Sequence, residues 1–389
     1  FREEIKDNLI GIAEGIKSSL PQDLQIILNN KKDFSSYLNI GQAGEGLLFL
    51  YLAYKYIKPG GVIAFVLPRN LLAGVSWFLA RALLTSKFHL KYVIVSNDRD
   101  DGYNFSENTR LSETLIVAKR VNNHHNSEET IFINLLKKPS SYLDAIILAD
   151  RINNNEGIIE ISKQGPIAVT RKISRTELLK RIDNWNLFSV ITDKELLNEI
   201  LNLLDNNLLK INNKKVMIPI TRLYNIIRSI GIDRHQFHDL FKVVDTRTPY
   251  PIVYTGEEEV RERMIISPNK YVELKNEKGR DVYRNFSGRV LLPDRIRWGT
   301  AHVVALYSER PILANIFYAI RLKPINEIEI EKLEKAFTLW LNTTWGLLIA
   351  LVSGEITEGE FASLKISQWK LTHVLNIHRL NRDTIEKLA

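Results

Sequence analysis

The hydrophobic pattern of the first third of the chain predicts alternating helices and strands. Apolar residues recur at helical spacing from Leu47 to Ile57, and the turn Lys58-Pro59-Gly60-Gly61 then ends the helix. The six residues that follow, 62–67, are all apolar. An unbroken run of this kind, closed by Pro68, predicts a strand buried on both faces, as in a parallel α/β sheet.

Similar patterns predict the neighbouring elements. A helix is expected over residues 71–84, with Asn70 as a possible cap. Further strands are expected at residues 92–95, 115–118 and 131–135. The turn residues of 153–157 then predict a domain boundary, so residues 1–152 form a first, α/β region.

Beyond the boundary the hydrophobic periods are shorter, which predicts a mixed α/β region over residues 153–389. The expected elements are strands at residues 158–161 and 167–170, and helices at residues 194–206, 223–230 and 328–345. Four tryptophans on apolar faces are expected in the core rather than as stacking platforms: Trp77, Trp340, Trp345 and Trp369.

Composition limits the class of protein. The 389 residues are enough for two or three domains, and 45% hydrophobic with 25% charged residues is the balance of a folded soluble chain. The absence of cysteine excludes disulfides and thiolate metal sites. The chain contains no apolar run of about 18 residues, so no membrane span is predicted. No secretory signal opens the chain, so we expect a cytoplasmic protein.

The positive charge is concentrated in one stretch. Residues 165–300 hold 24 Lys and Arg against 17 Asp and Glu, whereas residues 1–150 hold 17 against 16 and residues 301–389 hold 10 against 10. A local basic excess favours a polyanionic partner, because neutralised phosphates release counterions. A basic surface that merely keeps the protein soluble is the alternative.

Three passages together resemble one family. The first is residues 51–119, from the helix before Lys58-Pro59-Gly60-Gly61 to Leu115-Ile116-Val117-Ala118-Lys119. The second is Leu291-Leu292-Pro293-Asp294-Arg295-Ile296-Arg297-Trp298. The third is residues 339–347, followed by Gly354-Glu355 and Leu364-Lys365-Ile366. In this order they resemble the later half of the gamma-type adenine-N6 DNA methyltransferases of type I and type IIG restriction-modification systems.

The resemblance implies a fold, a partner and a cofactor. Residues 1–152 would be the C-terminal part of a methyltransferase domain, with a partial Rossmann-like sheet. Residues 153–389 would be a target-recognition region that binds double-stranded DNA. The complete enzyme would use S-adenosylmethionine to methylate adenine at a specific site.

Two motifs of that family are missing. The nearest strings to its glycine-rich cofactor loop and its Asn/Asp-Pro-Pro-Tyr/Phe tetrapeptide are residues 41–46 and Thr248-Pro249-Tyr250-Pro251. The first follows no apolar strand and the second has no leading Asn or Asp, so we expect a helix cap or loop and a plain turn. Because both motifs precede the counterpart of Tyr51, we expect an N-terminally truncated chain. No catalytic or cofactor-binding residue is assigned, and this chain alone is expected to be inactive.

Two alternatives remain. One is a non-catalytic DNA-binding or scaffold subunit derived from such an enzyme; a reading frame that continues upstream through both motifs would exclude it. The other is an unrelated α/β enzyme in which the Lys-Pro-Gly-Gly turn is coincidental. A structure without adjacent parallel strands around residues 62–67 would favour this second alternative.

The strand-like segment near residue 295 holds the first candidates for DNA contacts. Arg295 and Arg297 are two apart, so they point to one face of a strand, and arginine binds phosphate or guanine through two hydrogen bonds. Solvated surface arginines are the alternative. Arg289 extends this face if no bulge intervenes. His302 could contact a base, or could be an ordinary core or surface histidine.

Four further candidates lie earlier in the chain. Arg171 and Lys172 follow an apolar strand and could contact phosphates, with a solvated helix start as the alternative. Arg69 and Asn70 follow the strand of residues 62–67, at the edge where α/β sheets bind ligands, and could line the path of a flipped base. A surface arginine beside a helix cap is the alternative. The pair His235 and His238 has no third ligand in sequence, so no metal is expected.

Overall fold

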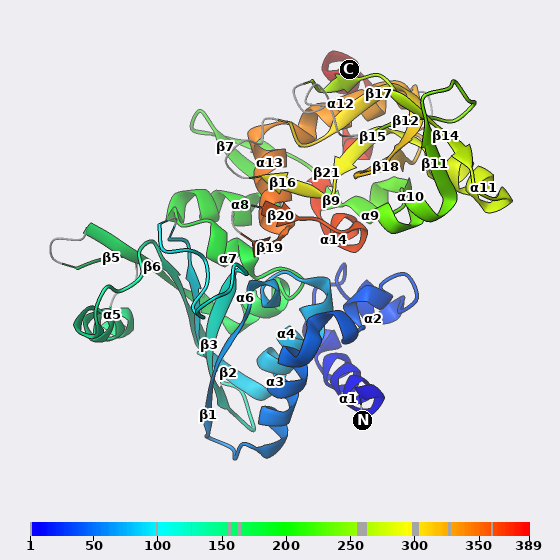
Figure 1. Ribbon diagram of the computed structural model, residues 1–389. Coiled ribbons are helices and arrows are strands. Elements are labelled where there is room, and N and C mark those ends of the chain that lie inside the picture. Colours follow the sequence, from blue (N-terminus) through cyan, green and yellow to red (C-terminus); the bar gives the residue numbers. More distant parts are fainter. Residues whose placement is uncertain are drawn as a thin grey trace. The chain divides into compact units, whose positions relative to one another are not determined.

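The computed structural model describes residues 2–98, 100–125, 127–154, 157–161, 165–254, 263–297, 303–325, 328–358 and 361–389 (Figure 1). The chain forms two compact units. Unit 1 consists of Phe1–Leu197 and Gly354–Phe361, and unit 2 of Asn198–Ser353 and Ala362–Ala389. The backbone therefore passes from one unit to the other three times.

Unit 1 is built on a six-stranded mixed sheet with the order β1-β3-β2-β4-β6-β5. Its strands are β1 (Val62–Pro68), β2 (Phe88–Ser96), β3 (Glu113–Arg120), β4 (Glu129–Leu135), β5 (Gly157–Ile161) and β6 (Gly165–Ser174). Among these neighbours only β2 and β4 are parallel, and the other pairs are antiparallel. The expected α/β fold is therefore present, with a mixed sheet in the first unit.

The expectation of a doubly buried parallel strand at residues 62–67 is wrong. β1 lies at the edge of the described sheet, and its neighbour β3 is antiparallel. Ile63 and Leu67 are buried, whereas Val62 and Val66 are 59% and 42% exposed, because only one face of the strand is covered. Because no parallel strand lies next to β1 in the described sheet, this pairing favours the alternative of an unrelated α/β enzyme. β1 and β2 do run in the same direction, but they are separated by β3, which is antiparallel to both.

Helices cover this sheet. The helix expected over residues 71–84 begins only at Phe78, because two short 3-10 helices, Arg69–Leu71 and Val75–Trp77, precede it, and Asn70 lies in the first of them rather than at a helix cap. α3 (Gly44–Tyr56) ends before the Lys-Pro-Gly-Gly turn, where Gly60 has a φ of 83° that favours glycine. α3 packs on β1 and α4, and α4 packs on β2. The helices of unit 1 are α1 (Arg2–Gly15), α2 (Ile26–Asn29), α3, α4 (Phe78–Lys87), α5 (Tyr142–Asn154), α6 (Arg175–Lys180), α7 (Asn186–Val190) and the first residues of α8 (Lys194–Asn206).

The two units divide at Leu197, and the expected boundary at residues 153–157 falls inside unit 1. The sheet continues past that turn, because β6 pairs with β4 along the whole length of β4, from Glu129 to Leu135. α5, which ends at Asn154, and the edge strand β5 therefore belong to the same unit.

A late segment of the chain completes unit 1. The backbone carbonyl of Gly354 accepts a hydrogen bond from Asn186 at 3.1 Å, and the Glu355 carboxylate accepts one from the Val75 amide at 3.3 Å. The Thr357 carbonyl accepts the amide of Ser112 at 3.0 Å. Glu355 is only 2% exposed, so this short strand, β19 (Glu355–Glu358), is part of the packed interior of unit 1.

Unit 2 is built on an eight-stranded sheet with the order β10-β18-β15-β17-β12-β14-β11, and β13 pairs with β17. Its strands are β10 (Ile227–Ile230), β11 (Phe241–Val244), β12 (Pro251–Val253), β13 (Ile265–Ile266), β14 (Lys270–Leu274), β15 (Gly288–Pro293), β17 (Leu306–Ala314) and β18 (Phe317–Leu322). Short strands outside it are β7 (Leu208–Ile211), β8 (Lys214–Met217), β9 (Ile220–Arg222), β16 (Arg295–Arg297), β20 (Phe361–Ser363) and β21 (His373–Leu375).

The helices of unit 2 pack around this sheet. They are α9 (Leu223–Ile226), α10 (Arg234–Leu240), α11 (Glu277–Phe286), α12 (Ile330–Leu341), α13 (Thr344–Ser353), α14 (Ile366–Leu371) and α15 (Arg382–Leu388). The single helix expected over residues 223–230 is wrong in its second half. There β10 pairs with β18, which buries Ile227 and Ile230 in a sheet rather than on a helix face.

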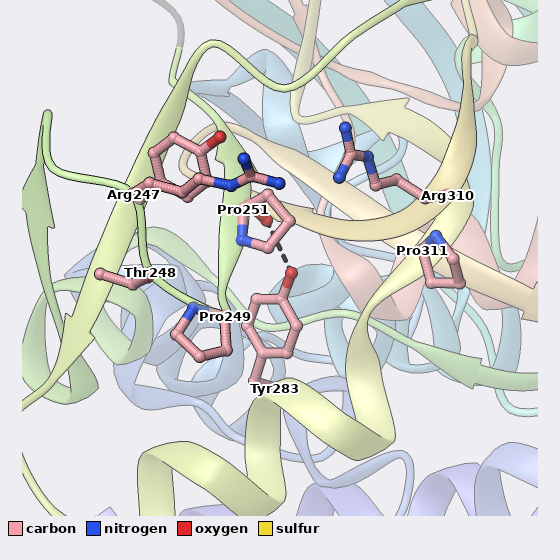
Figure 2. A pocket seen from close by; sticks show the side chains of 8 residues that line it. Arg247, Thr248, Pro249, Pro251, Tyr283, Arg310 and Pro311 are labelled. Carbon is pink, nitrogen blue, oxygen red and sulfur yellow. Dashed lines mark hydrogen bonds between the residues drawn. The ribbon is translucent and has the colours of Figure 1, made fainter.

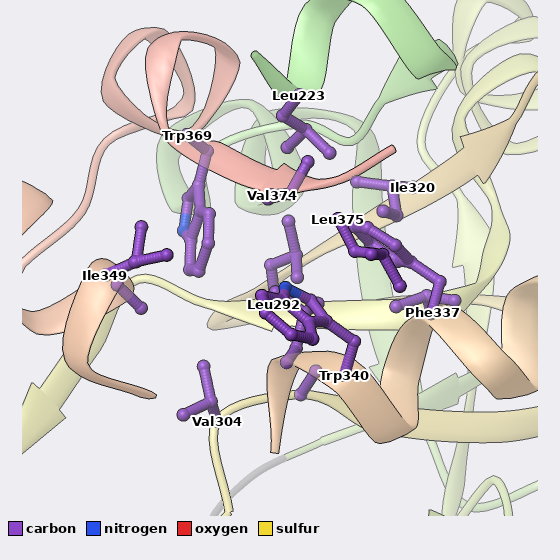
Figure 3. Packing of buried hydrophobic residues seen from close by; sticks show 14 of the residues in the cluster. Leu223, Leu292, Val304, Ile320, Phe337, Trp340, Ile349, Trp369, Val374 and Leu375 are labelled. Carbon is purple, nitrogen blue, oxygen red and sulfur yellow. The ribbon is translucent and has the colours of Figure 1, made fainter. Parts of the chain in front are cut away.

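The largest core of unit 2 holds β15 in place. Leu292, Phe337 and Trp369 are buried in one cluster, which Figure 3 shows from close by. The indole N–H of Trp369 also donates a hydrogen bond to the Pro293 carbonyl at 2.8 Å. Trp77, Trp340 and Trp369 are buried as expected, and Trp345 packs against the core. The end of β15, just before Arg295, is thus held in place by the core of unit 2.

The long helix expected over residues 328–345 is broken. α12 ends at Leu341, α13 begins at Thr344, and the two helices meet at 74°. The Asn342 side chain explains the break. Its oxygen accepts hydrogen bonds from the amides of Val304 and Ala305, and its amino group donates to the Ala305 carbonyl. These bonds hold Asn342 at the end of α12, outside a continuous helix. No single described helix is long and apolar enough to cross a membrane; α12 and α13 meet that test only when counted together.

Candidate nucleic-acid interface

Two arginines stand on one face of β16, as their spacing predicts. Arg295 and Arg297 are exposed, and Ile296 between them is 4% exposed and belongs to the core of unit 2. Asp294 separates β16 from β15; its amide donates to the Ile316 carbonyl at 3.3 Å, and its carbonyl accepts the amide of Leu364 at 2.8 Å. Both guanidinium groups are therefore carried by a short strand whose preceding residue, Asp294, is held by two backbone hydrogen bonds.

Arg295 lines a groove of about 670 Å³ together with the start of α10 and the turn between β17 and β18. The lining residues are Ile232, Asp233, Arg234, His235, His238, Asp294, Arg295, Asn315, Ile316, Phe317 and Tyr318. Asp233 caps α10, because its carboxylate accepts the amide of Gln236 at 2.9 Å. The helix thereby presents Arg234, His235 and His238 at the same groove as Arg295.

The groove combines donors with acceptors. Burial raises the pKa of Asp294, and the neighbouring Arg295 acts in the opposite direction. Burial also raises the pKa of Tyr318, so its phenol stays protonated and able to donate. Guanidinium and imidazole groups can bind phosphate, whereas carboxylate, phenol and amide groups can bond base edges. The chemistry suits a polyanion that also carries hydrogen-bonding bases.

Arg69 does not line a surface, which corrects the expectation for it. It is 2% exposed, and its guanidinium donates to the Asn97 side chain at 2.9 Å and to the Ser96 carbonyl at 3.2 Å. Burial lowers the pKa of Arg69 to about 10, which leaves it charged at neutral pH. Asn70 is half-buried, and its carbonyl accepts the amide of Gly74 at 2.6 Å. Arg69 thus fixes the end of β1 from within.

Arg171 and Lys172 have opposite environments, because they are consecutive residues of β6. Arg171 is 5% exposed and donates to the Thr192 carbonyl, so it cannot reach a partner outside the protein. Lys172 is exposed on the other face. Of the two expected phosphate contacts, the structure leaves only Lys172 accessible.

Arg289 is engaged within unit 2. Its guanidinium donates to the Glu331 carboxylate at 2.6 Å and to the Glu309 carbonyl at 3.1 Å, and it lies 3.7 Å from Glu334. It therefore does not extend the face of Arg295 and Arg297. His302 lies outside the described residues, as do Trp298 and Thr300.

Sequence reasoning missed two cationic features of unit 2. Arg234, His235 and His238 come to Arg295 only through the fold; the histidine spacing had suggested nothing beyond a metal pair. In the described part of the chain, no three His, Asp or Glu side chains gather as a metal site would require.

The second feature is the hairpin of β7 and β8. Lys210 and Lys215 are cross-strand partners, Lys214 follows the turn, and all three are exposed. Asn212 and Asn213 form the turn with positive φ angles of 49° and 63°, which asparagine tolerates. Like charges directly opposite each other destabilise a hairpin, so this arrangement favours an anionic partner. An Asn-Asn pair between lysine-rich strands was the available signal.

The hollow beside the glycine string at residues 41–46 is too small for S-adenosylmethionine. Gly41 and Gly44 border a hollow of only about 50 Å³, lined also by Arg2, Ile40, Glu45 and Leu48. Ligand pockets for molecules of this size are roughly 300 Å³ or more. Gly41–Ala43 forms a short 3-10 helix that leads into α3, so this string is a helix start, as expected. Thr248, Pro249 and Tyr250 lie in the loop between β11 and β12, and Pro251 begins β12.

No protein-family model and no curated protein matches the chain. Among solved structures it is similar to the type IIG restriction endonuclease BpuSI, with 13% identity and a TM-score of 0.33 over 88% of this chain and 43% of that one. It is also similar to the methyltransferase subunit of a type I restriction-modification system from Streptococcus thermophilus, with 22% identity and a TM-score of 0.28 over 36% and 29%.

A third similar structure is a modification subunit of a putative type I restriction enzyme from Vibrio vulnificus, with 18% identity and a TM-score of 0.25 over 34% of this chain and 28% of that one. The chain thus spans less than half the length of each of these proteins. The similarity is distant, and no residue role is carried over from it.

Proposed function

We propose that this chain provides DNA recognition and the later half of the catalytic domain in a site-specific adenine-N6 DNA methyltransferase of a restriction-modification or related defence system. Unit 1 is the methyltransferase part and unit 2 the recognition part, with the division at Leu197 rather than at residue 152. The observation that carries the DNA-binding part is the exposed pair Arg295 and Arg297 beside a groove that Arg234 also lines.

The charge distribution supports the same partner. Part of the basic excess of residues 165–300 is internal, since Arg171, Arg181 and Arg222 are buried. The exposed cations of this stretch include those of the groove and of the hairpin of β7 and β8, which belong to unit 2. A two-stranded ribbon and an arginine-bearing strand are both of a size that the major groove admits. Sequence-independent phosphate contacts and base contacts could thus come from separate elements.

Methyl transfer needs groups that this chain does not hold. The sequence has no Asn/Asp-Pro-Pro-Tyr/Phe motif, and the hollow beside Gly41 is too small for the cofactor. Those groups would come from another chain or from sequence outside these 389 residues. The alternative, a non-catalytic DNA-binding or scaffold subunit, is favoured by the same small hollow. Transfer of a labelled methyl group by the protein from its full reading frame would decide between them.

DNA binding itself is tested by fluorescence anisotropy with a labelled duplex of degenerate sequence at several salt concentrations. We expect the logarithm of affinity to fall linearly with the logarithm of salt concentration. Replacing both Arg295 and Arg297 with Ala should reduce that slope by about two. The double variant Arg379→Ala with Lys387→Ala removes two exposed charges of unit 2 elsewhere and is the matched control. Absence of binding, or binding that ignores salt, would contradict the proposal.

A further inference from the structure

A second hollow of unit 2 has two arginines and no carboxylate in its lining. Its volume is about 570 Å³, and it lies between the loop after β11 and the strands β12, β14 and β17. The lining residues are Arg247, Thr248, Pro249, Pro251, Tyr271, Tyr283, Arg310 and Pro311. Figure 2 shows the guanidinium groups of Arg247 and Arg310 directed toward each other across this pocket, from different segments of the chain.

The pocket wall is held rigidly. The Thr248 hydroxyl donates to the Val272 carbonyl at 2.8 Å and accepts the amide of Tyr250 at 3.2 Å. The Tyr283 hydroxyl donates to the Pro251 carbonyl at 2.6 Å, a bond drawn in Figure 2. Three prolines restrict the backbone of the lining further. The loop that carries Arg247 is therefore positioned before any ligand arrives, which lowers the entropy lost on binding.

The charges of the pocket are not compensated within the described residues. Arg247 and Arg310 are both exposed, and no described carboxylate forms an ion pair with either. Nearby cations of the same sheet differ in this respect: Lys242 pairs with Glu273, and Lys270 with Asp245. Two like charges that face one pocket repel each other unless an anion lies between them.

We propose that this pocket binds a phosphate group, separately from the groove of Arg295. Two guanidinium groups can each donate paired hydrogen bonds to phosphate oxygens, a geometry for which arginine is better suited than lysine. The rings of proline and tyrosine in the wall suit the sugar or base of a phosphate ester. The phosphate has two possible sources, the DNA backbone or a free nucleotide. The first source rests on the proposed function, and the second does not.

The experiment measures two ligands on the full chain: a deoxynucleoside monophosphate by isothermal titration calorimetry, and a labelled duplex by anisotropy across a salt series. The variants are Arg247→Ala, Arg310→Ala, the double variant, and Arg247→Lys, which keeps the charge but loses the paired donors. Arg379→Ala is the charge-matched control from the same unit. Because Arg247 and Arg310 are exposed, all variants should keep the wild-type urea midpoint.

If the pocket takes free nucleotides, each alanine variant should weaken monophosphate binding at least about tenfold and Arg247→Lys several-fold, with the control within twofold. If it takes the DNA backbone, the double variant should lower the salt slope by about two, beyond the loss from Arg295 and Arg297. Monophosphate binding sensitive to Arg247, in a protein that binds no duplex, would contradict the proposed function alone. Indifference of both ligands to Arg247 and Arg310 would overturn this proposal.

Discussion

Two buried arginines of unit 1 and three exposed arginines of unit 2 have opposite physical roles. In unit 1, Arg69 and Arg81 are buried and donate to backbone carbonyls and one amide, so they hold segments of the unit together. In unit 2, Arg234, Arg295 and Arg310 are exposed and line open hollows. The same side chain thus stabilises one unit from inside and is available to a partner in the other. Whether an arginine stabilises the interior or is available to a partner depends on the backbone carbonyls within hydrogen-bonding distance of its guanidinium group.

Arg81 is the clearest internal case. It is completely buried in α4, and its guanidinium donates to the carbonyls of Ile182 at 2.6 Å, Leu71 at 2.7 Å, Gly74 at 3.0 Å and Asp183 at 3.3 Å. Burial lowers the pKa of Arg81 to about 10, so it remains charged at neutral pH. It connects α4 with the segment before it and with the chain that follows α6.

The largest effect is expected from Arg81→Met. The change removes four hydrogen bonds to buried carbonyls, which should lower the free energy of unfolding of unit 1 by about 3–5 kcal/mol. Hydrogen exchange measured by mass spectrometry should show faster exchange in residues 71–85 and unchanged exchange in residues 288–293. Arg110→Ala, at an exposed position of the same unit, is the control. Equal exchange in both variants would show that Arg81 contributes little.

Unit 2 holds a buried carboxylate at Glu334. Burial raises the pKa of Glu334 to about 7, although Arg289 acts in the opposite direction. Because the folded pKa is above the value of the unfolded chain, its contribution to stability is full below about pH 4.5 and is lost as pH rises to about 7. Glu334→Gln should remove this dependence, so its stability advantage over wild type should grow by roughly 3 kcal/mol across that window.

Urea denaturation at pH 4.5 and pH 7 measures this difference, and Asp383→Asn, which changes an exposed carboxylate on α15 of the same unit, provides the comparison. A constant difference between wild type and Glu334→Gln at both values would mean that Arg289 keeps Glu334 ionised throughout.

A smaller effect separates the two classes of arginine in DNA binding. Arg295→Ala should lower the salt slope of duplex binding by about one, whereas Arg69→Met should leave that slope unchanged and instead reduce stability. Anisotropy and urea denaturation on the same samples give both quantities. A lower slope in Arg69→Met, at unchanged stability, would remove the distinction drawn between the units.

The smallest effect is expected from Lys172→Ala. Lys172 is the cation among the unit 1 candidates that stays exposed, so its removal should change unfolding free energy by less than about 0.5 kcal/mol. Its salt slope reports whether unit 1 contributes phosphate contacts: a decrease of about one would extend the DNA surface beyond unit 2.

The sequence was sufficient for elements whose period is local. β1, α3 and the strands at residues 92–95 and 115–118 follow from spacing alone, and so does the shared face of Arg295 and Arg297. It was insufficient where distant contacts decide. The apolar run of β1 does not reveal that one of its faces is uncovered, and Asn342 breaks a helix only because residues 304 and 305 lie beside it.

The candidate site shows the same limit. Arg69, Arg171 and Arg295 each follow or form a strand, and nothing in their local sequence distinguishes the buried two from the exposed one. The acceptors that bury them, such as the carbonyls of Ser96 and Thr192, are 21 or more residues away in the chain. Likewise, Pro293 and Trp369 are 76 positions apart in the chain, so the local sequence does not predict the hydrogen bond that fixes the strand leading to Arg295.

The segment Gly354–Phe361 has a consequence for biosynthesis. Unit 1 contains nearly all its residues once Leu197 has been made, yet its interior lacks Glu355 until the chain has grown past residue 361. At about 5–20 residues per second, ribosomes need roughly 10–30 s for the stretch between them. During that time the hydrogen-bond partners of Val75, Ser112 and Asn186 have not been synthesised. Unit 1 therefore cannot complete its folding until the segment Gly354–Phe361 has been translated.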